Sequence, residues 1–222
     1  MSDSPVIAFL NKMTDLILLN ALWLVCSLPV VTIGASTTAM YYVCILSIRQ
    51  GDGYVVRRFF KSFRENFVKA TILWLMILVL GAILAGDLFF WYWLGTPFGK
   101  VLFVLSMTVE AAFAMVCLYL FPVLAKLRGN MRQVIHNAAA FAVGYLPYTL
   151  ILMILTGLFV YMNIISPGMN AISVFIGFAG LVYIKSFFLY KVFMNHIDEK
   201  YDDFWTDGME ERHEGESDDR GI

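Results

Sequence analysis

The chain has 222 residues, of which 60% are hydrophobic and 15% charged, and its formal net charge at pH 7 is −1. Soluble globular domains average roughly 45–50% apolar and about 25% charged residues, so this composition excludes an ordinary soluble protein. Several apolar stretches are long enough to cross a hydrocarbon core of roughly 30 Å. We therefore expect an all-α, polytopic transmembrane helical bundle with about six membrane segments in residues 1–194.

The first two apolar segments, residues 13–31 and 35–49, are short, because about 14 helical residues cover only about 21 Å. They form either two tilted spans or a re-entrant hairpin that enters and leaves from the cytoplasmic side. The break between them is uncharged and rich in hydroxyl groups. It is either a tight turn that satisfies its own backbone or a buried helix start whose N–H groups suit an anionic or hydroxylated ligand. Its candidate site residues are Thr32, Ser36, Thr37 and Thr38.

A basic cluster follows, and six of the 16 lysines and arginines lie between Arg49 and Lys69. Three phenylalanines recur every four residues while most bases take another face, which predicts an amphipathic helix over residues 54–69. The helix either lies under anionic headgroups and fixes orientation or docks a cytoplasmic partner. No motif that reads nucleic acid accompanies the charge. The phenylalanines are Phe59, Phe63 and Phe67, and the candidate headgroup or partner contacts are Arg57, Arg58, Lys61, Arg64 and Lys69.

Residues 70–94 form the clearest span, which ends in three consecutive aromatic residues, Trp91 to Trp93, typical of a membrane interface. A short turn with Lys100 leads to a second span, residues 101–125. Another basic group, Lys126 to Arg132, follows it. Two crossings therefore separate the two basic clusters, as the positive-inside rule requires if both face the cytoplasm.

Each of these two spans contains one acidic residue. Glu110 lies near the bilayer midplane, where a carboxyl group is costly unless it is paired, hydrated or protonated. It is either a protonated group bonded to a neighbouring helix or part of a site for a polar substrate or a proton. Asp87 lies closer to the outer interface, where water can reach it. With the hydroxyl groups of the first break, these carboxyls make up the candidate intramembrane polar site.

The last two spans are expected over residues 138–164 and 170–190, because residues 133–184 contain no Asp, Glu, Lys or Arg. Lys185 and Lys191 can snorkel from the final span toward the inner interface. Residues 195–222 hold 11 of the 17 acids and should form a largely disordered cytoplasmic tail. Six crossings place both termini in the cytoplasm.

No catalytic signature is present. The sequence has no Gly-x-Ser-x-Gly, His-Glu-x-x-His or ATP-binding P-loop motif. Its three cysteines lie inside apolar segments, and none has a Cys or His neighbour at a metal-ligand spacing. We expect neither an enzyme nor a bound metal or cofactor.

Two stretches carry a family resemblance. Ser27-Leu-Pro-Val-Val-Thr-Ile-Gly-Ala-Ser-Thr-Thr-Ala39 with Tyr41-Tyr42, followed by Phe59-Phe-Lys-Ser-Phe-Arg-Glu-Asn-Phe67, resembles the YesL family of bacterial membrane proteins, over most of the chain to about residue 205. The resemblance implies an integral bacterial plasma-membrane protein, often encoded beside carbohydrate ABC importers and sensor kinases. The family has no established activity, so it implies no site residues.

Two functions are compatible with these features. The first is a nonenzymatic accessory or regulatory component of carbohydrate uptake, which contacts importer subunits or a sensor kinase through the basic helix and the acidic tail. The second is a small permease or channel for a polar solute such as a sugar, with Glu110 and residues 36–38 lining the path.

Overall fold

The structure is a computed structural model, and it describes residues 5–50, 54–126 and 129–194. These residues contain helices and no strand, which confirms the predicted all-α class, and six helical segments are long and apolar enough to cross a membrane. The predicted acidic tail lies outside the described residues. The elements are α1 (Pro5–Cys26), η1 (Val30–Thr32), α2 (Ile33–Gln50), α3 (Val55–Leu94), α4 (Pro97–Lys126), α5 (Met131–Gly144), α6 (Leu146–Ile165), α7 (Pro167–Ile172), η2 (Ser173–Gly177) and α8 (Phe178–Met194).

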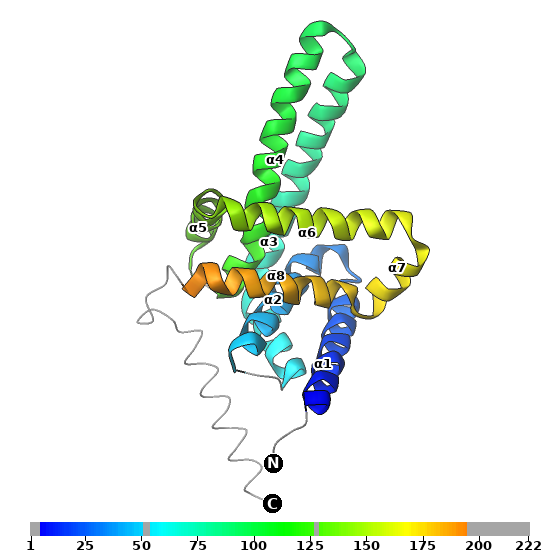
Figure 1. The fold of residues 1–222 in the computed structure, drawn as a ribbon. Coiled ribbons are helices and arrows are strands. Elements are labelled where there is room, and N and C mark those ends of the chain that lie inside the picture. The colour runs from blue at the N-terminus through cyan, green and yellow to red at the C-terminus, as the bar shows by residue number, and fades with distance from the viewer. Residues whose placement is uncertain (1–4, 51–53, 127–128, 195–222) are drawn as a thin grey trace, which may run out of the picture.

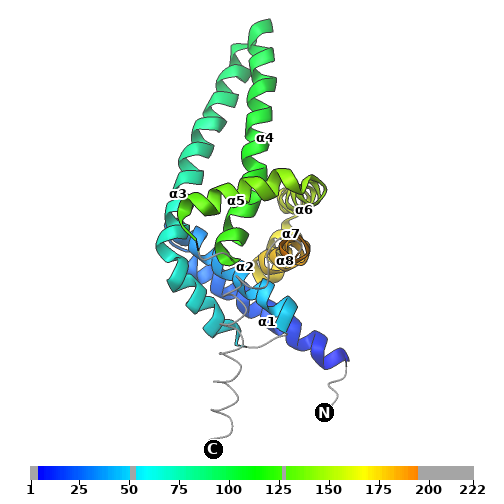
Figure 2. The ribbon, with the colours of Figure 1, turned by 90° about the vertical axis from the view of Figure 1, so that its left-hand side faces the viewer.

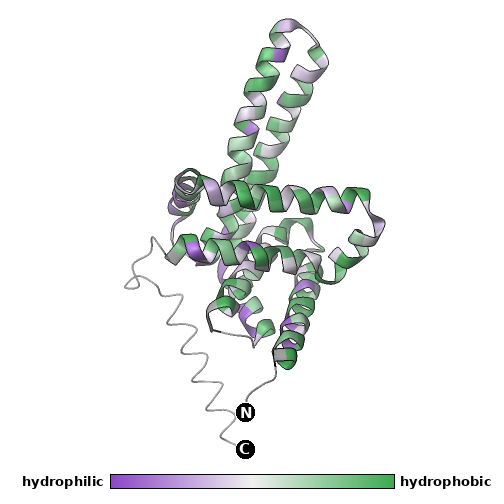
Figure 3. Ribbon diagram, in the orientation of Figure 1, coloured by the Kyte–Doolittle hydropathy of each residue, from purple (hydrophilic) through white to green (hydrophobic). Residues whose placement is uncertain are grey.

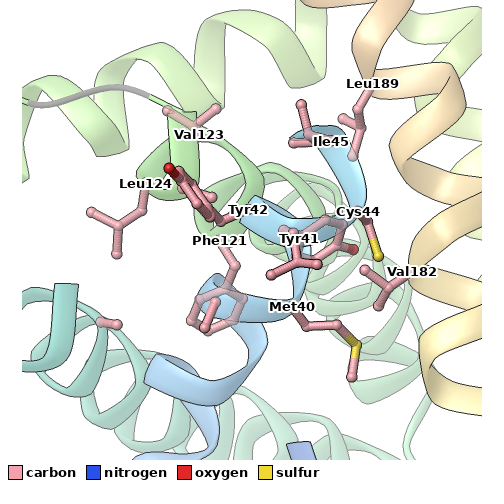
Figure 4. Packing of buried hydrophobic residues seen from close by; sticks show 14 of the residues in the cluster. Met40, Tyr41, Tyr42, Cys44, Ile45, Phe121, Val123, Leu124, Val182 and Leu189 are labelled. Carbon is pink, nitrogen blue, oxygen red and sulfur yellow. The ribbon is translucent and has the colours of Figure 1, made fainter. Parts of the chain in front are cut away.

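The core of the molecule forms around α2. Eight consecutive residues of this helix, Ala39 to Leu46, are buried, so α2 has neighbours on every side. Figure 4 shows Phe121 and Val123 of α4 and Leu189 of α8 beside it. A segment whose length left its role open in the sequence is therefore the central helix of the fold.

Helices α1 and α2 are both longer than their predicted segments. They have 22 and 18 residues, which correspond to about 33 and 27 Å of helix. Each contains a stretch apolar enough to cross a membrane. Their length favours the two-span alternative over the re-entrant hairpin.

The longest apolar helices are the least buried. Helices α3 and α4 form an antiparallel hairpin that projects from the body of the molecule (Figure 1), and Figure 3 shows apolar residues along both of its arms. In the most apolar 18-residue window, 6% of α3 and 0% of α4 is buried, compared with 67% for the span that contains α2. Exposing this surface to water is unfavourable, so the hairpin requires lipid or another apolar surface around it.

Local sequence explains the tip of the hairpin. Gly95 ends α3 with a φ of 62°, a left-handed conformation that glycine adopts without steric cost. The Thr96 hydroxyl accepts a hydrogen bond of 3.0 Å from the Gly99 N–H, and Pro97 occupies the first helical position. Helix α4 consequently begins four residues before the predicted start of this span.

Helix α3 is one continuous element of 40 residues, about 60 Å long. The predicted amphipathic helix, residues 54–69, is its first part rather than a separate helix, because no proline or glycine interrupts the chain before Gly81. This part packs against α2. A Cβ atom placed on Gly34 of α2 would lie 2.5 Å from the Ala70 carbonyl oxygen of α3, so only glycine permits this close approach.

The predicted span over residues 138–164 is divided into two helices. Helices α5 and α6 meet at Tyr145, which has a φ of −120° and a ψ of 48° and belongs to neither helix. Pro147 lies in the first turn of α6, where its missing N–H removes no helical hydrogen bond. It therefore begins a helix instead of kinking one. Helix α5 begins at a capping box formed by Asn130 and Gln133.

A buried threonine closes the corner between α5 and α6. The Thr149 hydroxyl donates to the Ala142 carbonyl oxygen at 2.9 Å and lies 2.9 Å from the Tyr119 hydroxyl of α4. A carbonyl oxygen can only accept, so the single proton of Thr149 goes to the backbone and Tyr119 is the donor to Thr149. This network joins three helices at a fully buried point.

The last candidate span, predicted over residues 170–190, is a helical run from Pro167 to Phe193 that contains one π-helical segment, η2. Asn20 of α1 binds this segment. Its side-chain amide donates to the Val174 carbonyl oxygen at 2.6 Å, and its side-chain oxygen accepts from the Ala179 N–H at 2.9 Å. The Asn20 side chain thus satisfies backbone groups where the regular helical pattern changes.

The candidate spans do not share one direction. Helices α3 and α4 run up the page in both Figure 1 and Figure 2, whereas α6 and α8 run across Figure 1 and toward the viewer in Figure 2. Helices that cross a flat bilayer tilt by at most about 40° from its normal. Length and hydropathy therefore identify which segments can cross, but the set that crosses together depends on their packing.

Candidate functional site

The hydroxyl groups of the first break are satisfied within the break and its neighbours. Thr32 donates to the Cys26 carbonyl oxygen at 2.6 Å. Ser36 and Thr38 are fully buried, and each donates to the carbonyl oxygen four residues earlier, at 3.1 and 2.9 Å. Thr37 accepts a hydrogen bond of 3.1 Å from the Trp23 indole. These contacts match the first alternative, a turn that satisfies its own backbone.

Asp87 joins the two arms of the hairpin. One carboxylate oxygen accepts a hydrogen bond of 2.9 Å from the Trp91 indole, one turn further along α3. The other accepts a hydrogen bond from the Ser106 hydroxyl of α4. Both oxygens have protein donors, so Asp87 works as a polar link between α3 and α4.

Glu110 has a different environment. It lies about 20 Å from the start of α4 at Pro97 and about 24 Å from its end at Lys126, hence near the middle of the helix. The side chain is half-buried, and it makes no hydrogen bond or ion pair with any residue that the structure describes. It lines a groove of about 500 Å³ whose walls come from α3 and α4 alone: Leu88, Phe89, Tyr92, Phe103, Met107, Glu110, Ala111 and Ala114.

The predicted intramembrane polar site is therefore three separate features. Asp87 is bonded inside the hairpin, Glu110 faces the groove, and the hydroxyl groups of residues 32–38 lie around the start of α2. The groove is lined by no residue of α1 or α2. The structure does not bring Glu110 and residues 36–38 to one path.

The predicted headgroup or partner contacts divide between surface and core. Arg57, Arg64 and Lys69 are exposed, and Lys61 is half-buried. Lys69 donates to the Gly129 carbonyl oxygen at 3.1 Å. Arg58 is only 6% exposed, because it lies on the face that packs into the body, so it is not a surface contact.

The phenylalanine face of this helix turns from core to surface along its length. Phe59 is fully buried, Phe63 is half-buried and Phe67 is 38% exposed. Neighbouring rings lie 6.1 and 5.4 Å apart, centroid to centroid, so the three rings form a continuous row. Burial at the start of the row holds this part of the helix against the body.

Two polar features were not selected as site candidates from the sequence. The Lys12 ammonium donates to the Ser47 hydroxyl at 2.6 Å and lies 4.5 Å from the centre of the Tyr183 ring, which joins α1, α2 and α8. Lys185 of α8 is 6% exposed, so it is buried rather than snorkelling outward. Each lies near the end of a span, where a lysine is often exposed. The local sequence therefore does not indicate whether such a lysine is exposed or packed into the fold.

Among the described residues, no group of three His, Cys, Asp or Glu side chains could hold a metal ion. The three cysteines are free thiols, buried at Cys44 and half-buried at Cys26 and Cys117. Their separate positions provide no paired thiol chemistry. The features with functional potential are therefore the groove at Glu110 and the exposed bases at the start of α3.

Comparison with known proteins gives one match. A family model described as "Protein of unknown function, DUF624" is similar to residues 16–88, about a third of the chain. The matched part contains the buried helix α2 and most of α3. No curated protein and no solved structure matches the chain.

Proposed function

We propose that the protein is a nonenzymatic accessory or regulatory component that binds another integral membrane protein. One observation carries the proposal: the two features that a solute path would need, Glu110 and the hydroxyl groups of residues 36–38, lie at separate places. The hydroxyl groups are occupied by hydrogen bonds within the protein. Glu110 instead opens to the outer surface of the hairpin.

The shape of the molecule supports a binding role. The α3–α4 hairpin presents long apolar faces, most of which contact no other part of the described chain. At the other end of α3, Arg57 and Arg64 are exposed and present positive charge, and the exposed Phe67 lies one helical turn after Arg64. The hairpin suits a partner within the membrane, and the basic face suits the partner's acidic surface or anionic headgroups.

The identity of the partner comes from the sequence resemblance. Because the chain resembles the YesL family, we propose subunits of a carbohydrate ABC importer, or an associated sensor kinase, as the partner in a bacterial plasma membrane. We also propose, from the positive-inside rule and an even number of crossings, that both termini face the cytoplasm. The match to the DUF624 family is compatible with this assignment but names no function.

Copurification tests the proposal. The protein is purified from its own bacterium in mild detergent, and importer subunits and sensor kinases are identified by mass spectrometry. We expect importer subunits with the wild type and their loss after the combined change Arg57→Glu, Lys61→Glu and Arg64→Glu. Arg58 is left unchanged because it is buried. The matched control is Lys100→Glu, which alters an exposed base at the hairpin tip.

Unchanged recovery of the importer with the triple variant would contradict the role of the basic face, provided that the variant elutes from gel filtration as the wild type does. The permease alternative has its own assay, uptake of candidate sugars by proteoliposomes. We expect no uptake above protein-free vesicles. Uptake that is lost with Glu110→Gln would replace the accessory role with the permease.

A further inference from the structure

The groove at Glu110 contains a carboxyl group to which the described residues provide no partner. The contrast with Asp87 shows that the hairpin can satisfy a carboxylate, since Trp91 and Ser106 donate to both oxygens of Asp87. Ser106 lies one helical turn before Glu110 on α4, but its hydroxyl donates its proton to Asp87 instead. The Glu110 carboxyl therefore faces the groove without a donor from the described chain.

Lipid alone does not satisfy this group. Glu110 is near the middle of a 30-residue apolar helix, where acyl chains offer no hydrogen-bond donor. Ionisable groups at this depth usually pair with one another or face a protein interior. A hydrogen-bond donor on a neighbouring protein would satisfy the Glu110 carboxyl group.

The groove has the form of a helix-binding surface. On α4 its lining residues are Phe103, Met107, Glu110, Ala111 and Ala114, whose spacing puts them on one helical face. Small residues such as the two alanines let a second helix approach closely in a membrane. Phe89 and Tyr92 of α3 line the same groove and add apolar contact area.

A second copy of this chain does not offer the complementary charge. Residues 70–99, 101–125 and 133–184 contain no Lys or Arg, and these ranges cover helix α6 and the apolar parts of both hairpin arms, apart from Lys100 at the tip. Two hairpins placed together would put Glu110 against uncharged side chains or against another acidic residue at this depth. Of the two lysines within the last span, Lys185 is buried in the body, and Lys191 lies in the last turn of α8, at the end of the span rather than at mid-depth.

We propose that the groove binds a transmembrane helix of a different protein, which presents a Lys or Arg side chain to Glu110 at mid-depth in the membrane. The proposal rests on the accessory role proposed above and adds the chemistry of the partner's helix. The cation donates to the carboxylate, and the alanines permit close contact between the helices.

Synthetic transmembrane peptides test this chemistry without the natural partner. The full-length protein, labelled with a donor fluorophore, is placed in vesicles of phosphatidylcholine and phosphatidylglycerol. Leucine-rich peptides of about 23 residues with a central Lys or a central Leu carry the acceptor. We expect the Lys peptide to associate about tenfold more tightly than the Leu peptide with the wild type.

Variants assign this preference to the groove. Glu110→Leu should reduce the Lys-to-Leu ratio to about one, and Ala114→Leu should weaken both peptides by filling the groove. Asp87→Asn is the control, because the oxygens of Asp87 are already occupied, and it should keep the preference. Circular dichroism and gel filtration check that each variant is folded.

Equal association of the two peptides with the wild type would overturn the proposal, as would a preference that survives Glu110→Leu. Energy transfer between copies of the protein that disappears with Glu110→Leu would assign the groove to self-association and overturn it as well. Loss of peptide selectivity with intact importer copurification would refute the partner chemistry alone. Peptide selectivity without importer copurification would refute the importer as the partner, and the proposed binding of a cationic helix by the groove would stand.

Discussion

Replacing Gly34 by alanine tests the closest helix contact in the fold. The added Cβ would lie 2.5 Å from the Ala70 carbonyl oxygen and 2.7 Å from the Trp74 Cβ. Ordinary contacts of this kind are longer by roughly 1 Å, and a gap of 0.5–1 Å between packed surfaces forfeits about a quarter to a half of their dispersion attraction. Helices α2 and α3 must separate, and Ala70 offers backbone rather than a flexible side chain, so the contact cannot be relieved locally.

The magnitude follows from opposing terms. Overpacking lowers the free energy of unfolding by about 1–3 kcal/mol, while the higher helix propensity of alanine raises it by up to about 1 kcal/mol. The shift also disturbs the Trp74 indole, which donates to the Val30 carbonyl oxygen at 2.8 Å. We expect a net loss of about 1–2 kcal/mol, or roughly 2–8 °C in melting temperature for a chain of this size.

The assay is thermal unfolding in detergent, followed by tryptophan fluorescence or by loss of the monodisperse gel-filtration peak. Gly157→Ala in α6 is the matched control, because a Cβ at that position meets no atom within 4 Å. We expect the control to melt at or slightly above the wild-type temperature. A Gly34→Ala variant as stable as the wild type would refute the close approach of α2 to α3, and an equal loss in the control would show that the effect is not local.

The remaining predictions concern buried hydrogen bonds. Asn20→Leu should destabilise the protein by about 1–3 kcal/mol and accelerate hydrogen exchange at Ala179, whose N–H loses its acceptor; unchanged exchange there would contradict the contact. Thr149→Val should cost about 1–3 kcal/mol because the Tyr119 hydroxyl loses its acceptor, whereas Tyr119→Phe leaves Thr149 bonded to Ala142 and should cost less. In the double variant the two losses should not add, and additive losses in melting experiments would exclude a direct bond.

The prediction of the helical class succeeded because its signal is local. Long apolar runs with few charges identify candidate spans whatever their neighbours are, and the described residues contain six of them. The tip of the hairpin is also local, since Gly95, Thr96 and Pro97 each favour the conformation they adopt. The orientation of the termini stays a prediction from the distribution of lysine and arginine.

The candidate site was less predictable because pairing depends on contacts distant in sequence. Asp87 and Glu110 look alike as single acids in apolar spans, yet Ser106 binds only the first. Arg58 and Arg57 are adjacent in one basic run, and helix rotation buries the former and exposes the latter. Such differences follow from which face of a helix meets its neighbour.

The sequence by itself determined that this is a helical membrane protein, because hydropathy and charge act through the local solvent of each segment. The tertiary structure alone decided that α2 is the buried centre, that residues 32–38 satisfy themselves and that Glu110 faces outward. The most apolar helices are the most exposed ones. In a bilayer, apolar side chains gain little by leaving lipid for protein, so hydropathy predicts membrane crossing while close packing and polar pairing decide the core.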